Sequence, residues 1–356
     1  MFDARIARTY LILASVIAAG PLIGLFASSV TGRAAKLPVQ MVVASATADA
    51  MRIGMTAPAD AKSAVPPTAT PTSPAPTATA VPPTSTPTAQ PTPPPKPPRG
   101  PSVFANNQVI AFYGSPISAQ LGVLGRYYGD DLVRWLKGEA GIYDNMNGSR
   151  GVVPALDLIY AQVQADPTDN GLYVRYLDDS VVQSYIQLAE QNDLQVILDL
   201  QIGRGDVLTE VQKIQRFLEN PRVHVAIDPE YAVGPNGIPI QTPGVITGEQ
   251  INAVQLYLSD LGKYMNTPPK MLVIHQYMDG TIVDGGAVQR FDDVDLVLNM
   301  DAFGSPQDKL AKYQRYASEP YAEHRSYNVF LQHDWPLQSE QEVMNLNPQP
   351  DMVEYQ

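Results

Sequence analysis

The sequence predicts a (β/α)8 barrel of the TIM type over residues 102–356, preceded by a membrane-targeting segment and a Pro/Thr-rich stalk. After residue 102, short apolar runs alternate with segments of helical periodicity, which is the pattern of repeated βα units around a parallel sheet. The 255 residues of this part are a typical length for such a barrel. By contrast, residues 65–101 lack the large apolar side chains that a folded core requires.

Residues 1–35 are predicted to target the chain to a membrane. Arg5 and Arg8 precede an uncharged run at 10–30, which is long enough to cross a bilayer as a helix. Two interpretations fit: a retained signal anchor, or a signal peptide cleaved after the small residues 27–29. We favour the anchor, because the run is long for a signal peptide. Both interpretations predict an extracellular domain, either anchored to the cell membrane by a single span or secreted.

Residues 36–101 are predicted to form a disordered linker of Pro, Thr, Ala and Ser. Pro-Thr pairs occur five times between 71 and 92. Proline favours an extended chain of about 3.1 Å per residue, so 66–101 can span roughly 100 Å. We therefore expect a spacer between the membrane and the barrel.

The charge and the cysteine content exclude several classes of function. Residues 102–356 hold 16 Lys and Arg against 33 Asp and Glu, a net charge of −17. A domain this acidic repels phosphate backbones, so we expect no nucleic-acid partner. The chain has no cysteine. This excludes disulfides, thiolate metal sites, cysteine nucleophiles and lipid-modified cysteine.

Eight short apolar runs are the predicted barrel strands. They are 108–113, 152–158, 195–201, 222–228, 270–277, 294–301, 328–333 and 351–356.

Helix-start signals lie between these strands. They are Asp206, the pair Thr247 and Gln250, Ser305 before Pro306, and the pair Ser339 and Glu342. No helical segment follows the eighth strand, so the predicted barrel lacks its last outer helix.

The alternation of side chains along each strand predicts which residues face into the barrel. In 222–228 the positions 223, 225 and 227 are Val and Ile and suit the helix layer, so Asp228 faces inward. The inward set lies at the carboxyl ends of the strands, where barrel enzymes carry their chemistry. The same phase places inward Tyr113, Asp157, Asp199, Gln201, His275, Tyr277, Asn299, Asp301 and Glu354.

The pair Asp228 and Glu230 is the sharpest catalytic signal. Two carboxylates two residues apart on a strand share one face about 6.6 Å apart at the backbone, and their repulsion raises the proton affinity of one. We expect Glu230 to be the general acid, with an ionised Asp228 stabilising positive charge. Asp199, on the neighbouring strand, is the third predicted catalytic residue. For each carboxylate, a structural role in capping or ion pairing is the competing interpretation.

The remaining candidates are predicted to bind substrate. His275 and His333 offer imidazoles, while Phe303 and Trp335 offer rings that can stack on sugars or simply pack. The predicted substrate-binding set is Tyr113, Asp157, Gln201, His275, Tyr277, Asp301, Phe303, His333 and Trp335. No cofactor is predicted, although the same carboxylates and imidazole are suitable ligands for a divalent metal.

Several motifs resemble a group of exported bacterial (β/α)8-barrel proteins. They are 227–230, 272–276, 299–304 and the terminal Tyr355-Gln356, and the resemblance covers about 105–356. It implies the barrel fold without implying a particular reaction. More distantly, the Asp228 and Glu230 spacing is similar to chitinase-like and lysozyme-like glycoside hydrolase barrels. The longer Asp-x-x-Asp-x-Asp-x-Glu run of chitinases is missing, and only its last Asp-x-Glu is matched.

Three functions follow as hypotheses. The first is a cell-surface glycoside hydrolase that acts on a polysaccharide or cell-wall glycan. The second is a hydrolase barrel that depends on a divalent metal. The third is a glycan-binding surface protein without catalysis, because a fold by itself does not imply a reaction.

Overall fold

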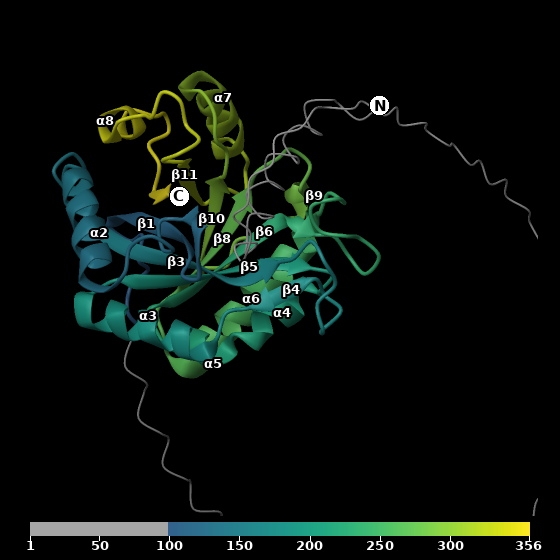
Figure 1. Cartoon of the computed structure of the whole chain (residues 1–356). Helices are drawn as coiled ribbons and strands as arrows, with labels where there is room; N and C mark the ends of the chain where they lie inside the picture. Colours follow the sequence, from purple (N-terminus) through teal and green to yellow (C-terminus); the bar gives the residue numbers. More distant parts are fainter. Residues whose placement is uncertain (1–98) are drawn as a thin grey trace, which may run out of the picture. The chain divides into compact units, whose positions relative to one another are not determined.

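The computed structural model describes residues 99–356, which form a closed barrel of eight parallel strands (Figure 1). Around the barrel the order is β1, β3, β5, β6, β8, β10, β11 and β12, and β12 pairs again with β1. This confirms the predicted TIM-type fold. The bounds are β1 Asn107–Ser115, β3 Gly151–Val163, β5 Gln195–Gly203, β6 Val223–Ala232, β8 Lys270–Gln276, β10 Val294–Met300, β11 His324–Val329 and β12 Met352–Tyr355.

The predicted strand at 328–333 is wrong in position, because β11 covers His324–Val329 instead. The apolar run after Asn328 suggested that the strand continued, but the chain turns there. The Asp334 carboxylate accepts a hydrogen bond from the Phe330 backbone N–H at 2.9 Å and pairs with the buried Lys309 ammonium. At the other end, His324 stacks on the Phe104 ring with centroids 4.1 Å apart, so a polar residue begins the strand.

Helices follow most of the strands and cover the outside of the barrel. Figure 1 shows α3, α4, α5 and α6 along one flank, with α7 and α8 on the opposite flank. The bounds are α2 Gly129–Asp144, α3 Asp179–Asn192, α4 Val207–Lys213, α5 Gln215–Leu218, α6 Gly248–Met265, α7 Pro306–Ala317 and α8 Glu340–Met344.

The predicted helix starts are confirmed. The Asp206 carboxylate accepts from the Thr209 N–H, and the Ser305 hydroxyl accepts from the Asp308 N–H. Both predicted capping boxes form, at the first turns of α6 and α8.

The structure adds short elements that the sequence did not predict. They are β2 Ser118–Gly122, β4 Val174–Tyr176, the pair β7 Ile246–Thr247 and β9 Ile282–Val283, and the 3-10 turn η1 Gly285–Ala287. β2 folds back antiparallel onto β1. A Cβ on Gly114 would lie 2.4 Å from the Leu121 carbonyl oxygen, so only glycine permits this hairpin. The hairpin leans over the carboxyl end of β1 and contributes to the site below.

Apolar layers line both faces of the barrel wall. The larger lies between the strands and the helices, and the smaller fills the lower part of the barrel interior. The two faces of each strand therefore have different environments, as the predicted alternation requires. The interior layer contains Phe104, Val109, Ala111, Ala155, Ile197, Ala226, Met271, Val273, Val297 and Met352.

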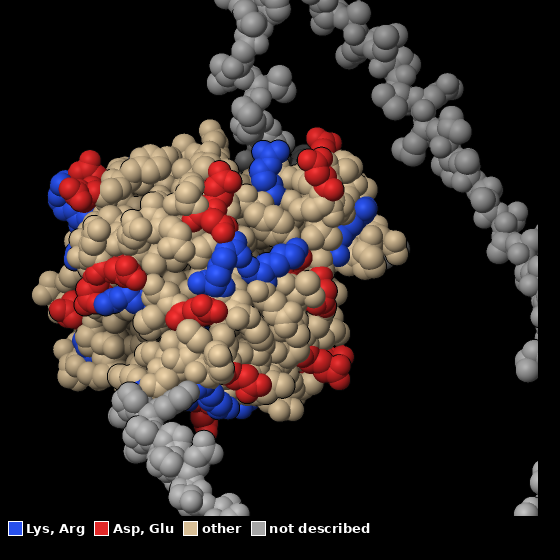
Figure 2. Space-filling model, turned by 90° about the horizontal axis from the view of Figure 1, so that it is seen from below, with Lys and Arg blue, Asp and Glu red and all other residues tan. Residues whose placement is uncertain are grey.

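The predicted membrane-targeting segment 1–35 and the linker up to residue 98 lie outside the described residues. From 99 to 356, no helix is both long enough and apolar enough to cross a membrane. The face in Figure 2 carries acidic and basic side chains in alternation, so the negative charge is not gathered on that side. Part of it lies inside the barrel, where the candidate site is found.

Candidate active site

The upper half of the barrel interior is polar. On seven strands, the residue two positions beyond an apolar interior residue is polar and also faces inward. Asp157 follows Ala155 in this way, and Asp228 follows Ala226. The predicted inward phase is therefore confirmed. The seven residues are Tyr113, Asp157, Asp199, Asp228, His275, Asn299 and Glu354.

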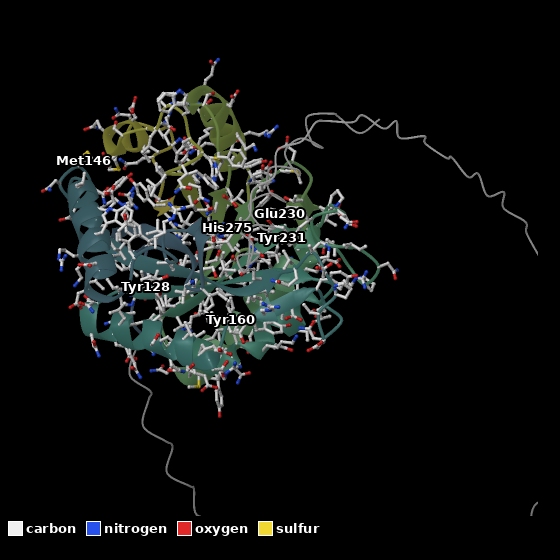
Figure 3. The ribbon with its side chains drawn as sticks, in the orientation of Figure 1. Tyr128, Met146, Tyr160, Glu230, Tyr231 and His275 are labelled. Atoms are coloured by element: carbon white, nitrogen blue, oxygen red, sulfur yellow. The ribbon has the colours of Figure 1, made fainter. Side chains whose placement is uncertain are left out.

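A cavity opens above this polar layer at the carboxyl ends of the strands. Figure 3 shows Glu230 and Tyr231 close to His275, far from Tyr128. Most of the predicted site residues line the cavity. The lining includes Tyr113, Gln201, Asp228, Glu230, Tyr277, Asp301, Phe303 and His333 from the predicted set.

Asp228, Glu230 and Asp301 meet at the floor of the cavity. One carboxylate oxygen from each lies within 4.8 Å of the other two. Asp228 and Glu230 are each only 3% exposed, whereas the Asp301 side chain is 13% exposed. These three residues, the candidate catalytic trio, come from the carboxyl-terminal part of β6 and from the residue after β10.

The backbone around Glu230 is fixed by a neighbouring loop. The Gly244 N–H donates a hydrogen bond to the Glu230 carbonyl oxygen at 2.9 Å. A Cβ on Gly244 would lie 2.6 Å from the same oxygen, so a larger residue would push the loop off the strand. Glu230 Oε2 has no hydrogen-bond partner among the described residues, which leaves it available to a ligand.

Burial and neighbouring charge keep a proton on Glu230. Desolvation is the largest cause and the charge of Asp301 the second, and together they raise the pKa of Glu230 to about 8. The direction of this shift is the one that the predicted general-acid role of Glu230 requires, and that role stays a prediction.

The environment of Asp228 in the structure differs from the one expected for an ionised partner of Glu230. Burial, followed by the charges of Asp199 and Glu230, raises the pKa of Asp228 well above its usual range, which opposes the ionised role predicted for Asp228. Asp301 has a different environment, because its Oδ1 accepts hydrogen bonds from Asn328 Nδ2 at 2.6 Å and from Gln356 Nε2 at 3.3 Å.

Asp199 lies beneath the cavity and does not line it. Its Oδ2 accepts a hydrogen bond from the Tyr113 hydroxyl at 2.9 Å, and the Tyr113 ring does reach the cavity. Burial raises the pKa of Asp199 to about 7, against the opposing effect of His275. Asp199, predicted as a catalytic residue, is therefore placed to position Tyr113 and is not part of the cavity lining.

His275 lies at the centre of the polar layer and is fully buried. Its Nε2 is 3.9 Å from Asp157, and its Nδ1 is 3.7 Å from Asp301 and 3.8 Å from Glu354. Burial by itself would lower the pKa of His275, but Glu354 and the other carboxylates raise it well above its usual value. His275 does not line the cavity, so its predicted contact with substrate is not supported.

Two further predicted residues lie away from the cavity. Asp157 is fully buried near the middle of β3, which continues to Val163, so Asp157 lies deeper than the expected strand end. Trp335 is 85% exposed and does not line the cavity. The strand β11 ends at Val329, before the predicted end at 333, and Trp335 lies beyond the turn that follows it. By contrast, Phe303 packs against Tyr277 and His333 at the cavity wall.

Several lining residues were not predicted from the sequence. Gln120 and Arg126 reach the cavity from the unpredicted β2 hairpin and the loop after it, Tyr231 lies near the end of β6, and Phe330 follows β11. The turn residues Ser115-Pro116 were the available signal for the hairpin. Tyr231 was not predicted as a lining residue, because it directly follows Glu230 and strand alternation assigns that position to the outer face.

Comparison with known protein families and with curated protein sequences finds no match. Among solved structures, Thermotoga maritima Cel5A in complex with cellobiose substrate is 11% identical, with 72% of this chain and 91% of that chain covered and a TM-score of 0.41. A GH18 chitinase from Pseudoalteromonas aurantia is 11% identical, with 70% and 94% covered and a TM-score of 0.35. A tri-modular GH5 endo-beta-1,4-glucanase from Bacillus licheniformis is 11% identical, with 71% and 54% covered and a TM-score of 0.37.

Proposed function

We propose that the protein is a cell-surface glycoside hydrolase that cleaves a polysaccharide or cell-wall glycan by carboxylate acid/base catalysis. The observation that carries the proposal is the catalytic trio at the cavity floor, with oxygens of all three residues within 4.8 Å. Glycoside hydrolysis requires a carboxylic acid and a carboxylate on either side of the scissile bond. Surface location rests on the sequence of residues 1–35.

The roles follow from the environment of each group. Glu230 holds a proton and donates it to the glycosidic oxygen as the bond to the anomeric carbon breaks. The Asp301 carboxylate, whose Oδ1 accepts hydrogen bonds from two amide groups, attacks the anomeric carbon and forms a glycosyl ester as the protonated leaving group departs. A water molecule then attacks the anomeric carbon of this ester, the bond to the Asp301 oxygen breaks, and Glu230 takes a proton from that water.

The cavity walls are suited to a sugar ring. Tyr277 and Phe303 lie 6.1 Å apart between ring centroids and both line the cavity. Aromatic faces pack well against pyranose rings, while Gln201 supplies an amide for hydroxyl groups. Gln201 is also fixed in place, because its Oε1 accepts a hydrogen bond from the Val163 N–H at 2.9 Å.

The spacing of the trio predicts the stereochemistry. One oxygen from each residue lies within 4.8 Å of the others, which favours the separation of about 5–5.5 Å between the carboxyl groups of retaining enzymes over the roughly 6.5–9.5 Å of inverting enzymes. We therefore expect the first product to keep the anomeric configuration of the substrate. Proton NMR of the freshly released sugar measures this directly, and an inverted product would contradict the assigned trio.

Glu230→Gln in the full chain tests the proposal. The amide keeps the shape but cannot donate the acidic proton, so we expect hydrolysis to fall by about 10²–10⁴-fold with nearly unchanged thermal stability. The assay is the release of reducing ends from a panel of plant, fungal and bacterial wall polysaccharides. Asp193→Asn is the matched control, because Asp193 is an exposed carboxylate at the end of α3. Equal hydrolysis by Glu230→Gln and wild type would exclude the mechanism, and glycan binding without turnover would favour a non-catalytic module.

The pH profile tests the protonation state of Glu230. Catalysis needs the protonated acid, so kcat/KM is expected to fall as the pH rises through about 8. Above that pH the decline approaches tenfold per unit. A falling limb near pH 4.5, the usual value for a glutamic acid, would contradict the assignment.

A further inference from the structure

A second group of ionisable side chains lies below the catalytic trio. Asp157 on β3, His275 on β8 and Glu354 on β12 are all fully buried, and one ligand atom from each lies within 4.8 Å of the others. None of the three lines the cavity. The proposed hydrolase mechanism gives them no chemical step.

Several polar atoms of this group have no partner among the described residues. They are both carboxylate oxygens of Asp157, Nε2 of His275 and Oε2 of Glu354. Buried polar atoms in folded proteins are nearly always hydrogen-bonded, so unpartnered atoms that converge on one point indicate a bound species. The distance from His275 Nε2 to Asp157 Oδ2, 3.9 Å, is too long for a direct hydrogen bond.

The charge balance of the barrel interior points to a cation. Six carboxylates surround His275, and within residues 99–356 no Lys or Arg forms an ion pair with any of them. Buried carboxylates require compensation by protons, by ion pairing or by a metal. The six are Asp157, Asp199, Asp228, Glu230, Asp301 and Glu354.

We propose that Asp157, His275 and Glu354 bind one first-row divalent cation, with Zn²⁺ and Mn²⁺ as the best-suited ions. The imidazole nitrogen favours these ions, because Ca²⁺ takes oxygen ligands only. The site would stabilise the barrel interior beneath the catalytic trio. This inference does not depend on the proposed hydrolase activity.

The geometry suits such an ion. Ligands that bind one ion at about 2.1 Å can lie at most about 4.2 Å apart, and the separation of His275 Nε2 and Asp157 Oδ2 meets that limit at 3.9 Å. Asn299 supports the site from outside. Its Nδ2 donates to Glu354 Oε1 at 3.1 Å, which leaves Oε2 free to face the ion.

Metal content of the full chain tests the proposal. The protein is stripped with a chelator, dialysed against Zn²⁺, Mn²⁺, Mg²⁺ or Ca²⁺ separately, and analysed for bound metal and for thermal stability. We expect about one equivalent of Zn²⁺ or Mn²⁺ with a raised Tm, and little retention of Mg²⁺ or Ca²⁺. The absence of a retained ion, with an unchanged Tm, would show that protons balance the charge and would overturn the proposal.

Two isosteric variants separate this site from the catalytic trio. Asp157→Asn and Glu354→Gln remove one ligand charge each and should weaken binding by more than the 10–100-fold that loss of an outer-shell partner costs. Glu230→Gln is the control and should retain the ion while losing hydrolysis. If Glu230→Gln loses the ion and Asp157→Asn keeps it, the cation belongs to the trio and the assignment is wrong. Circular dichroism confirms that each variant is folded.

Discussion

The lower and upper layers of the barrel interior differ sharply although they share the same strands. Val273 in the lower layer packs among apolar side chains, whereas His275, two residues further along β8, lies among carboxylates. The apolar side chains of the lower layer need no hydrogen-bond partner, while the upper layer leaves several carboxylate oxygens unpartnered. The comparison shows that two residues along each strand separate the apolar side chains that stabilise the barrel from the polar side chains that are suited to catalysis or binding.

Truncation of the lower layer is expected to give the largest change in stability. Met271 is fully buried in that layer, so Met271→Ala leaves a cavity and should cost about 2–5 kcal/mol. Chemical denaturation of the full chain measures this difference. Leu256→Ala, at a 52% exposed position on α6, is the control and should change stability by less than about 0.5 kcal/mol. An equally mild Met271→Ala would mean that the lower layer is not a packed core.

Neutralising an upper-layer carboxylate is expected to have the opposite sign. The pKa of Asp199 rises from 3.8 to about 7 on folding, so the native state binds a proton more tightly than the unfolded state. The resulting stability is complete below pH 3.8 and is lost as the pH rises through about 7. With chelator present, Asp199→Asn should therefore increase stability by about 1–3 kcal/mol at pH 8 and have little effect at pH 4.

Urea unfolding of wild type and Asp199→Asn at the two pH values tests this prediction. Asp193→Asn is again the matched control, because its carboxylate is 89% exposed and pairs only with Arg222 among the described residues. That variant should show no such dependence on pH. A loss of stability in Asp199→Asn at pH 8 would mean that the upper layer needs its negative charge, and the contrast between the layers would fail.

A helix cap outside the barrel should have the smallest effect. The Thr247 hydroxyl accepts a hydrogen bond from the Gln250 N–H at 3.1 Å at the start of α6. Thr247→Ala should cost about 1 kcal/mol at both pH 4 and pH 8, because no titrating group is involved. Thermal denaturation at the two pH values checks this. A strong pH dependence in Thr247→Ala would show that pH acts on the whole domain and not on the upper layer.

The strand pattern predicted much of the site. The inward phase of Asp228, Glu230 and Asp301 follows from alternation, because the helix layer requires the apolar residues between them. The sequence pattern did not predict how deep each inward side chain lies along the barrel axis. Asp157 and His275 were expected at the rim, yet the length of β3 and the stagger between strands bury both below the cavity. The early end of β11 likewise depended on Asp334 and Lys309, which meet only in the folded chain.

The sequence by itself determined the barrel, the helix caps and the face on which each strand residue lies, because these depend on local periodicity and on neighbours in the chain. The tertiary structure decided which carboxylates share a cavity and which share the buried imidazole. It also decided that Asp301, and not Asp228, accepts hydrogen bonds from two amide groups. Proton affinity depends on burial and on charges contributed by other strands, and strand register alone sets those distances.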